Sequence, residues 1–355
     1  NEALGLPRPW DQQWSLRLQQ ILAYETDLLE YEDLFDGSHV VTAKTEALKD
    51  EARAMLAKLD ASGGTIDNID FMKTALVESQ RARLKEIEAG RQIVVGVNRY
   101  ETTETSPLSG GDGSIMAQDH GAESRQIAKL KAWRSKRSDD AVANAIGELR
   151  AAAASGANIM PPSIAAAKAG VTVGEWGAAL REAFGEYRGP TGVAVIIQTD
   201  GEEDLEKVKG EVERVSKKLG RTLTYVVGKP GLDGHSNGSE QIAARARQAG
   251  MNVIYEGIRF TPEEIVQQAI DSKAHVVGLS ILSGSHLDLV KDTLGVLRAK
   301  GLNIPVVVGG IIPEADALAL KQMGVRRVYT PKDYKITQIM GDVVKVVEET
   351  LTTAE

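Results

Sequence analysis

The sequence predicts an α/β protein whose last third, from about residue 222, is a doubly wound domain with a five-stranded parallel sheet. Short β-branched runs alternate there with helical patterns five times. Strand candidates such as Val306-Val307-Val308 are continuously apolar, which is typical of parallel strands covered on both faces. Polar or glycine-rich clusters follow three of these runs.

The expected elements alternate without interruption. Strands are expected at 223–227, 252–255, 275–279, 305–308 and 327–329, and helices at 242–249, 262–271, 287–299, 315–323 and 336–348. The short crossovers between them favour a flavodoxin-like arrangement. Ligands of such a domain bind beyond the carboxyl ends of the strands.

The region before this domain shows mainly helical sequence patterns. Amphipathic patterns predict helices at 14–22, 42–59 and 69–88, and the apolar run 92–98 has the length of a strand. The glycine-rich segment 109–114 is interpreted as a loop, because no Gly-Lys-Ser/Thr follows it to form a phosphate-binding loop.

An alanine-rich stretch follows. Helices are expected at 126–137, 139–155 and 173–184. Pro161-Pro162 and Gly170 interrupt the helical pattern, and residues 188–192 are interpreted as a hinge. The basic face of the first helix is interpreted as solvated. These changes in sequence pattern predict three parts, 1–119, 120–190 and 191–355.

Composition excludes several functions. The chain has no cysteine, so disulfides, thiolate nucleophiles and cysteine-ligated metals are absent. A net charge of -8 argues against nucleic acid as a partner. No apolar stretch reaches the roughly 18 residues of a membrane span, and the first residues do not show the pattern of a signal peptide. A cytoplasmic location is the expectation.

The three polar clusters fall at one end of the predicted sheet, at 228–238, 280–286 and 309–312. Within the first, Asp233 and His235 form a pair with chemical meaning, because a carboxylate orients a ligating imidazole and makes it more basic. The nearby glycines leave room for a large planar ligand. On this motif alone, a hydrogen-bonded pair in an ordinary loop is an equal alternative.

The rest of the pattern, and the family that it resembles, favour the ligand-binding interpretation. Gly238 and Ser280 enclose 41 residues, and Leu282 and Gly309 enclose 26. The pattern Asp-x-His-x-x-Gly, Ser-x-Leu and Gly-Gly resembles the cobalamin-binding domain of methionine synthases, corrinoid carriers and cobalamin-dependent mutases. The resemblance implies that His235 replaces dimethylbenzimidazole as the lower axial ligand of cobalt, the base-off/His-on mode. It assigns cofactor binding to Lys229, Asp233, Gly234, His235, Ser236, Gly238, Ser280, Leu282, Gly309, Gly310 and Thr330.

In that resemblance the displaced nucleotide tail enters a slot beside the sheet. Ser280 would bond the buried base, Leu282 would pack on it, and the glycines at 309 and 310 would admit the tail. Lys229 would extend the His–Asp chain.

The remaining histidines give weaker signals. His275 is interpreted as a satisfied core histidine, and His286 as either a contact behind the ligand or a helix cap. His39 and His120 have no partner spacing that suggests a metal.

The upstream part resembles the adenosylcobalamin-dependent acyl-CoA mutase family. Residues 1–14 and 94–100 are similar to the last part of its (β/α)8 barrel, and the alanine-rich helices to its linker. Details at 10–14, 30–37 and 231–238 are closer to ethylmalonyl-CoA mutases than to methylmalonyl-CoA mutases. The implied activity is a radical carbon-skeleton isomerisation of ethylmalonyl-CoA and methylsuccinyl-CoA. The resemblance also implies that Glu2 contacts the adenosyl ribose. It assigns no catalytic residue in this portion of the protein.

The family barrel needs about 250 residues, whereas only about 119 barrel-like residues are present. The sequence is therefore expected to begin inside the barrel, and to bind cobalamin without turning over substrate. An acyl-CoA substrate, a homodimer or complementary barrel chain, and a G-protein chaperone are the implied partners, with no nucleic acid and no membrane.

Alternative functions remain. One is a fragment of a methylmalonyl-CoA-type mutase. Another is a corrinoid carrier without mutase activity, although about 220 residues before the first strand are more than its helical bundle needs. A light- or cobalamin-sensing regulator lacks a basic DNA-reading helix, and a cofactor-free domain leaves the aligned loops unexplained.

Overall fold

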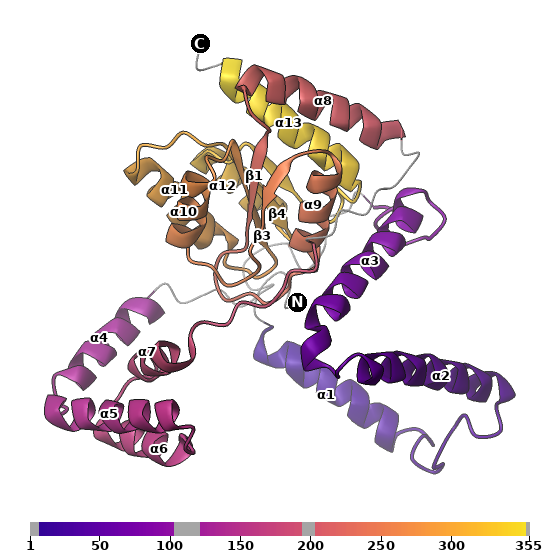
Figure 1. Cartoon of the computed structure of the whole chain (residues 1–355). Helices are drawn as coiled ribbons and strands as arrows, with labels where there is room; N and C mark the ends of the chain where they lie inside the picture. Colours follow the sequence, from indigo (N-terminus) through magenta and orange to yellow (C-terminus); the bar gives the residue numbers. More distant parts are fainter. Residues whose placement is uncertain (1–6, 103–120, 194–202, 353–355) are drawn as a thin grey trace. The chain divides into compact units, whose positions relative to one another are not determined.

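The computed structural model describes residues 7–102, 121–193 and 203–352 of the 355-residue chain (Figure 1). It divides into two compact units. One comprises Asn1–Met116 with Pro190–Glu355, and the other comprises Ala117–Gly189. The predicted loop at 109–114, Glu2 and His120 lie outside the described residues.

The first unit contains a five-stranded sheet in which every pair of neighbours is parallel. Its strands are β1 (Thr224–Gly228), β2 (Asn252–Ile254), β3 (Val276–Ile281), β4 (Val306–Gly310) and β5 (Arg327–Tyr329). Their order, β2-β1-β3-β4-β5, reverses direction between β1 and β3. The predicted doubly wound fold is confirmed, and the reversal marks where a ligand crevice is expected.

All five predicted helices of this domain are present. They are α9 (Asn237–Gln248), α10 (Pro262–Asp271), α11 (His286–Ala299), α12 (Glu314–Met323) and α13 (Ile336–Thr352). Helix α8 (Glu203–Leu219) was missed. Its apolar residues Leu205, Val208, Val212 and Val215 recur at helical spacing and are buried. Many charged residues between them hid this pattern.

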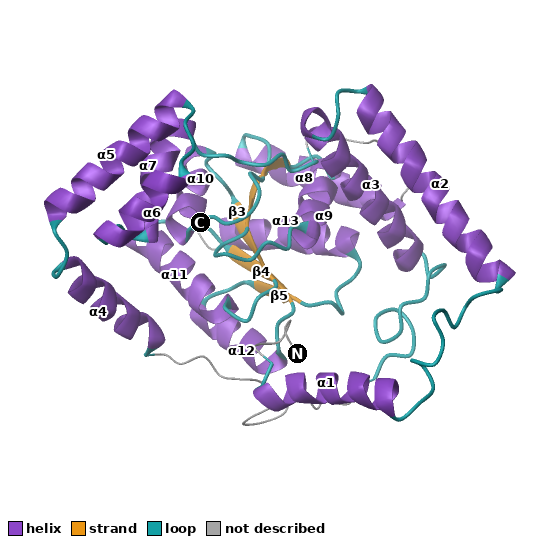
Figure 2. Cartoon of the chain, turned by 90° about the horizontal axis from the view of Figure 1, so that it is seen from below, coloured by secondary structure: helices purple, strands orange, loops and turns teal. Residues whose placement is uncertain are grey.

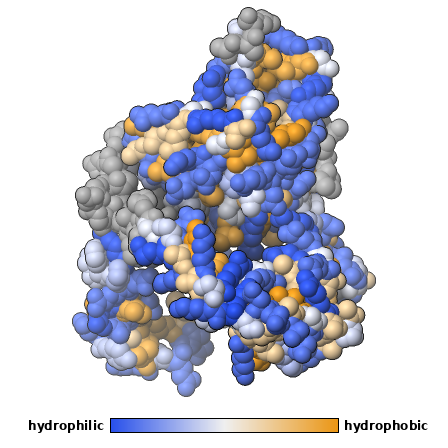
Figure 3. Space-filling model, turned by 90° about the vertical axis from the view of Figure 1, so that its left-hand side faces the viewer, coloured by the Kyte–Doolittle hydropathy of each residue, from blue (hydrophilic) through white to orange (hydrophobic). Residues whose placement is uncertain are grey.

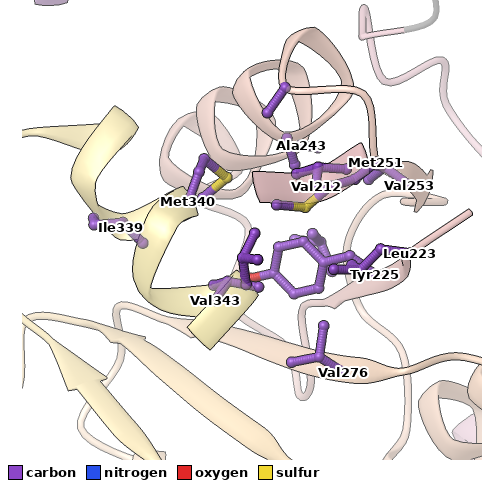
Figure 4. Packing of buried hydrophobic residues seen from close by; sticks show 14 of the residues in the cluster. Val212, Leu223, Tyr225, Ala243, Met251, Val253, Val276, Ile339, Met340 and Val343 are labelled. Atoms are coloured by element: carbon purple, nitrogen blue, oxygen red, sulfur yellow. The ribbon is translucent and has the colours of Figure 1, made fainter. Parts of the chain in front are cut away.

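The helices cover the sheet in two layers (Figures 1 and 2). One buried cluster joins the sheet to α8, α9 and α13, and a second joins it to α10, α11 and α12. Figure 4 shows Tyr225 of β1 inside the first cluster, close to Val343 of α13 and Val276 of β3. This layer also contains the cavity described below.

The amino-terminal part of this unit is helical. Its helices are α1 (Pro9–Tyr24), α2 (His39–Ala61) and α3 (Ile69–Glu88), preceded by the short helix η1 (Ile66–Asn68). Helix α3 packs against α9. Apolar side chains of α1 and α2, such as Trp14 and Leu48, are exposed. On another face of the molecule, Figure 3 shows hydrophobic residues scattered over a largely hydrophilic surface.

The strand predicted at 92–98 is wrong. This segment forms turns, with a single bridge between Val95 and Arg99. The Asn98 side chain takes the backbone groups that a neighbouring strand would otherwise bind. Its Oδ1 accepts from the Val94 amide at 2.8 Å, and its Nδ2 donates to the Ile87 carbonyl at 2.8 Å.

The second unit contains α4 (Ala122–Arg134), α5 (Asp139–Ser155), α6 (Met160–Ala169) and α7 (Val173–Phe184). Helix α6 was not predicted. Pro161 and Pro162 lie in its first turn, where proline is tolerated because the amide would be unpaired there. None of the described helices combines the length and apolar character needed to cross a bilayer.

Candidate cofactor-binding site

The three predicted clusters meet at the carboxyl edge of the sheet. There, the loop after β1 and the loops after β3, β4 and β5 surround a cavity of about 450 Å³. The cavity continues inward between the sheet and helices α9 and α13, with Ile242 and Ile339 on the helix side. A polar rim therefore leads into an apolar slot.

Asp233 organises the rim. Its Oδ2 accepts from Lys229 Nζ at 2.7 Å and from the Leu282 amide at 3.1 Å. Its Oδ1 accepts from the His235 amide at 3.0 Å and contacts His235 Nδ1 at 2.7 Å. The carboxylate thus joins the loop after β1 to the loop after β3. Lys229 also donates to the Ser280 carbonyl at 3.3 Å.

These bonds fix the charge of the carboxyl. Burial raises the pKa of Asp233, but hydrogen bonds from Lys229, His235 and Leu282 outweigh burial and hold that pKa well below its usual range. The Lys229 side chain is 1% exposed, so the pair is taken out of water. A buried charge pair is retained only where geometry and further hydrogen bonds compensate for desolvation, and here both are present.

His235 is the exposed end of this chain of contacts. Its side chain is 74% exposed, whereas that of Asp233 is 4% exposed. Nδ1 faces the carboxylate, which fixes the ring orientation and leaves Nε2 as the free nitrogen. Among the described residues, Nε2 has no hydrogen-bond partner. The ring is held from behind and open in front, which is the arrangement of a metal-ligating histidine with a carboxylate partner.

Most predicted cofactor residues line the cavity. The lining residues among them are His235, Gly238, Ser280, Leu282, Gly309, Gly310 and Thr330. Lys229 and Asp233 lie behind this surface and position it. Gly234 and Ser236 belong to the loop but not to the lining, and Ser236 precedes helix α9, where its carbonyl accepts from Ser239 Oγ at 2.8 Å.

The two predicted glycines of β4 differ. A Cβ added to Gly309 would meet nothing nearer than Tyr329 Cβ at 3.9 Å, so a side chain there would extend into the slot. A Cβ added to Gly310 would overlap the Ile281 carbonyl oxygen. Gly310 is therefore required by the packing of β3 against β4, whether or not a ligand is bound.

Sequence reasoning missed the inner part of the slot. Gly278 of β3 leaves space that the Tyr225 ring occupies, since an added Cβ would overlap the tyrosine hydroxyl. Tyr225, Gly278 and Tyr329 all line the cavity. The signal was available: residues two apart on a strand face the same side, and Gly278 lies two before Ser280.

Helix α3 supplies another wall, through Gln80 and Leu84. Three groups of polar contacts hold it in place. Lys73 pairs with the buried Glu240 at 2.7 Å, Gln241 Nε2 donates to the Val77 carbonyl at 3.0 Å, and the Ile336 amide donates to Glu88 Oε1 at 2.9 Å. The amino-terminal part thus completes the slot.

His275 and His286 take structural positions. His275 Nδ1 accepts from the Thr224 amide at 2.8 Å, and burial together with the nearby Arg221 lowers the pKa of His275 to about 4. His286 is buried, with Nε2 at 2.8 Å from Asp316 Oδ2, and it opens α11. Among the described residues, no group of three or more His, Cys, Asp or Glu could hold a metal ion.

Comparisons with known proteins agree with this geometry. Residues 223–335 match the family model described as B12 binding domain, and residues 1–186 match the model described as Methylmalonyl-CoA mutase. The fold and site therefore define a B12-binding α/β domain joined to a mutase-type helical part. The chain belongs to the methylmalonyl-CoA mutase family.

Individual relatives refine this placement. The chain is 60% identical over its whole length to an ethylmalonyl-CoA mutase of Cereibacter sphaeroides, covering 54% of that protein. It is 56% identical to an ethylmalonyl-CoA mutase of Methylorubrum extorquens over 99% of this chain and 51% of that one. A methylmalonyl-CoA mutase of Cereibacter sphaeroides is 32% identical over 93% of this chain and 47% of that one. The chain spans about half the length of these relatives.

Proposed function

We propose that this chain is the cobalamin-binding portion of an adenosylcobalamin-dependent mutase that interconverts ethylmalonyl-CoA and methylsuccinyl-CoA. His235 is the lower axial ligand of cobalt in this proposal. One observation carries it: the buried Lys229–Asp233 pair holds His235 Nδ1 and leaves Nε2 free at the mouth of a deep apolar slot.

The residues present fit such a cofactor. Cobalamin bound without its own base on cobalt needs one protein nitrogen at the corrin and a separate space for the displaced nucleotide tail. His235 offers that nitrogen, and the 450 Å³ cavity offers that space. The buried hydroxyl of Tyr329 has no hydrogen-bond partner among the described residues, which is a cost that a bound polar group or water would remove.

Each part of the site has a distinct task. Ser280 would bond the buried base, and Leu282 would pack on it. The open space at Gly309 admits a flat group between the sheet and the helices. Thr330 lines the rim, and its backbone amide donates to Asp333 Oδ2 at 2.8 Å. Lys229 and Asp233 keep the His235 ring oriented.

The cofactor supplies the radical chemistry when it is bound, and the chain supplies orientation and shelter from water. The substrate assignment rests on the two ethylmalonyl-CoA mutases, which are far more similar to this chain than the methylmalonyl-CoA mutase is. A mutase of methylmalonyl-CoA type is the alternative. The division at 119 and 190, the contact of Glu2 with the adenosyl group, a dimer or complementary barrel chain, and a chaperone belong to the same proposal.

The activity is tested by mixing the purified chain with adenosylcobalamin and ethylmalonyl-CoA, with and without a chain carrying the amino-terminal half of an ethylmalonyl-CoA mutase. Methylsuccinyl-CoA is expected only when both chains are present. Methylmalonyl-CoA is the matched substrate control, and its faster conversion would contradict the substrate assignment. Turnover by this chain alone would contradict the need for a complementary barrel chain.

A further inference from the structure

Helix α9 begins two residues after His235 and carries a buried acid in its first turn. The side chain of this acid, Glu240, is 4% exposed, and its Oε1 lies 2.7 Å from Lys73 Nζ of helix α3. Lys73 lies 167 residues earlier in the chain. Among the described residues, it is the only cationic side chain that forms an ion pair with Glu240. A buried charge depends on its partner, so the start of α9 depends on α3.

Further hydrogen bonds hold the same turn on two sides. Toward α3, Gln241 Nε2 donates to the Val77 carbonyl at 3.0 Å, one helical turn beyond Lys73. Toward the sheet, Ser239 Oγ lies 2.9 Å from the hydroxyl of Tyr255, the residue that follows β2. The first turn of α9 is therefore held between α3 and the carboxyl end of β2.

This turn is also part of the cavity wall. Gly238 and Gln241 line the cavity, and so does His235, which lies just before the helix. Neither Lys73 nor Glu240 lines it. A shift of the turn would therefore move the cavity wall and the loop that carries His235 together, without any contact between the ion pair and a bound ligand.

The two members of the pair differ in their access to water. The Lys73 side chain is 27% exposed, whereas that of Glu240 is 4% exposed. A lysine that loses its partner can extend its flexible stem and keep its ammonium group in water. The buried carboxylate reaches water only if the first turn of α9 moves. Loss of the lysine is therefore expected to displace α9, whereas loss of the glutamate charge is not.

We propose that Lys73 and Glu240 are positioning residues that couple the docking of helix α3 to the shape of the cofactor site. This role rests on the proposed cobalamin site and adds to it a dependence on the amino-terminal part of the chain. With the pair intact, the first turn of α9 stays against α3, and the cavity wall and the His235 loop stay in place. Helix α3 thereby contributes to cofactor affinity through residues that do not touch the cofactor.

Absorbance titration with cobalamin tests this coupling in the wild-type chain, Lys73→Met, Glu240→Gln and the double variant. Lys73→Met leaves the buried carboxylate unpaired and should weaken binding at least about fivefold, the lower end of typical coupling between sites. Glu240→Gln keeps the shape but removes the charge, so it should lose little affinity. The double variant should bind as Glu240→Gln does, because no buried charge remains. Lys49→Met, which removes an exposed lysine paired with Glu46 in α2, is the matched control and should bind as the wild type does.

A second measurement separates positioning from a loss of folding. Thermal unfolding of the unliganded variants gives a temperature at which all of them are folded, and the titrations are made there. Electron paramagnetic resonance of each chain saturated with Co(II) cobalamin then reports the fraction of cobalt that carries a histidine nitrogen. This fraction should fall in Lys73→Met and recover in the double variant.

Unchanged affinity in Lys73→Met, or a loss that the double variant does not recover, would overturn the coupling and leave the cobalamin site standing. Equal histidine signals in Lys73→Met and the wild type would also overturn it. Failure of the wild-type chain to bind cobalamin would instead overturn the proposed site itself, and the coupling with it.

Discussion

The two faces of the sheet in the carboxyl-terminal domain are built from the same strands but differ in how they are packed. On the face covered by α10, α11 and α12, β3 contributes Val277, Leu279 and Ile281, all buried in one cluster. On the face covered by α9 and α13, the alternating positions Gly278 and Ser280 of β3 line a cavity. One face is filled with side chains, and the other keeps space for a ligand.

This difference shows how a stable scaffold holds an open slot. Removing side chains from a core normally costs stability, because the cavity loses dispersion contacts and apolar burial. Here the filled face and the part of the first cluster around α8 carry the packing. The small residues that line the slot are Gly278 and Ser280 of β3 with Gly309 and Gly310 of β4, on strands whose carboxyl ends lead into the loops of the site.

The largest effect on stability is expected at Asp233, which lies at the carboxyl edge of the sheet. Asp233→Asn leaves the buried Lys229 ammonium without its carboxylate, and should lower the free energy of unfolding by about 3–5 kcal/mol. The folded pKa of Asp233 lies below its unfolded value of about 3.9. The stability that it contributes is therefore present above that value and is lost as the pH falls through the folded pKa.

Urea unfolding from pH 3 to pH 8 measures this contribution. The difference between wild type and Asp233→Asn should stay constant above about pH 5 and shrink below about pH 4. A difference that grew in acid would contradict the assignment of the charge to Asp233. Asp271→Asn, at the end of α10 and away from the site, is the matched control and should change stability little.

The next largest effects are expected at two neighbouring residues of β3 whose side chains lie on opposite faces of the sheet. Ile281 is fully buried on the filled face, so Ile281→Ala should cost about 2–5 kcal/mol. Ser280→Ala, on the slot face, should change stability by less than about 1 kcal/mol and weaken cobalamin binding. Urea unfolding and ligand titration of both variants test the contrast. Equal losses of stability would show that the slot face carries packing as well.

A smaller effect on stability and a clear effect on binding are expected at β4. Gly309→Val should fill the slot, lower cobalamin affinity at least tenfold (about 1.4 kcal/mol) and leave the unliganded fold intact, because a Cβ there has room. Gly310→Ala should destabilise the unliganded protein, since its Cβ would overlap the Ile281 carbonyl. Calorimetry and titration distinguish them. Loss of folding in Gly309→Val would show that the slot face contributes packing to the unliganded fold.

The sequence predicted the sheet, its helices and the rim of the site well, because each depends on local patterns. Continuous apolar runs identified the strands, and turn chemistry placed Asp233 and His235 after β1. Helix α8 was missed because charged residues dilute its apolar stripe, although Val212 and Val215 keep helical spacing.

Non-local features were harder to predict. The slot wall from Gln80 and Leu84 depends on the packing of α3 against α9, more than 150 residues away in the sequence. Tyr225 could be placed in the slot only once its ring was seen to cross Gly278. The false strand at 92–98 failed because Asn98 satisfies the backbone locally, which a count of apolar residues does not reveal.

We expect His235 Nε2 to bind cobalt, and electron paramagnetic resonance of the chain loaded with Co(II) cobalamin tests this most directly. Growth with 15N-histidine should change the nitrogen splitting of the axial ligand in the wild-type chain. His235→Ala should lose this isotope effect, whereas His286→Ala, in which a buried histidine outside the cavity lining is removed, should keep it. A splitting that does not respond to histidine labelling would show that another nitrogen holds the metal, and would contradict the assignment of His235 as the axial ligand.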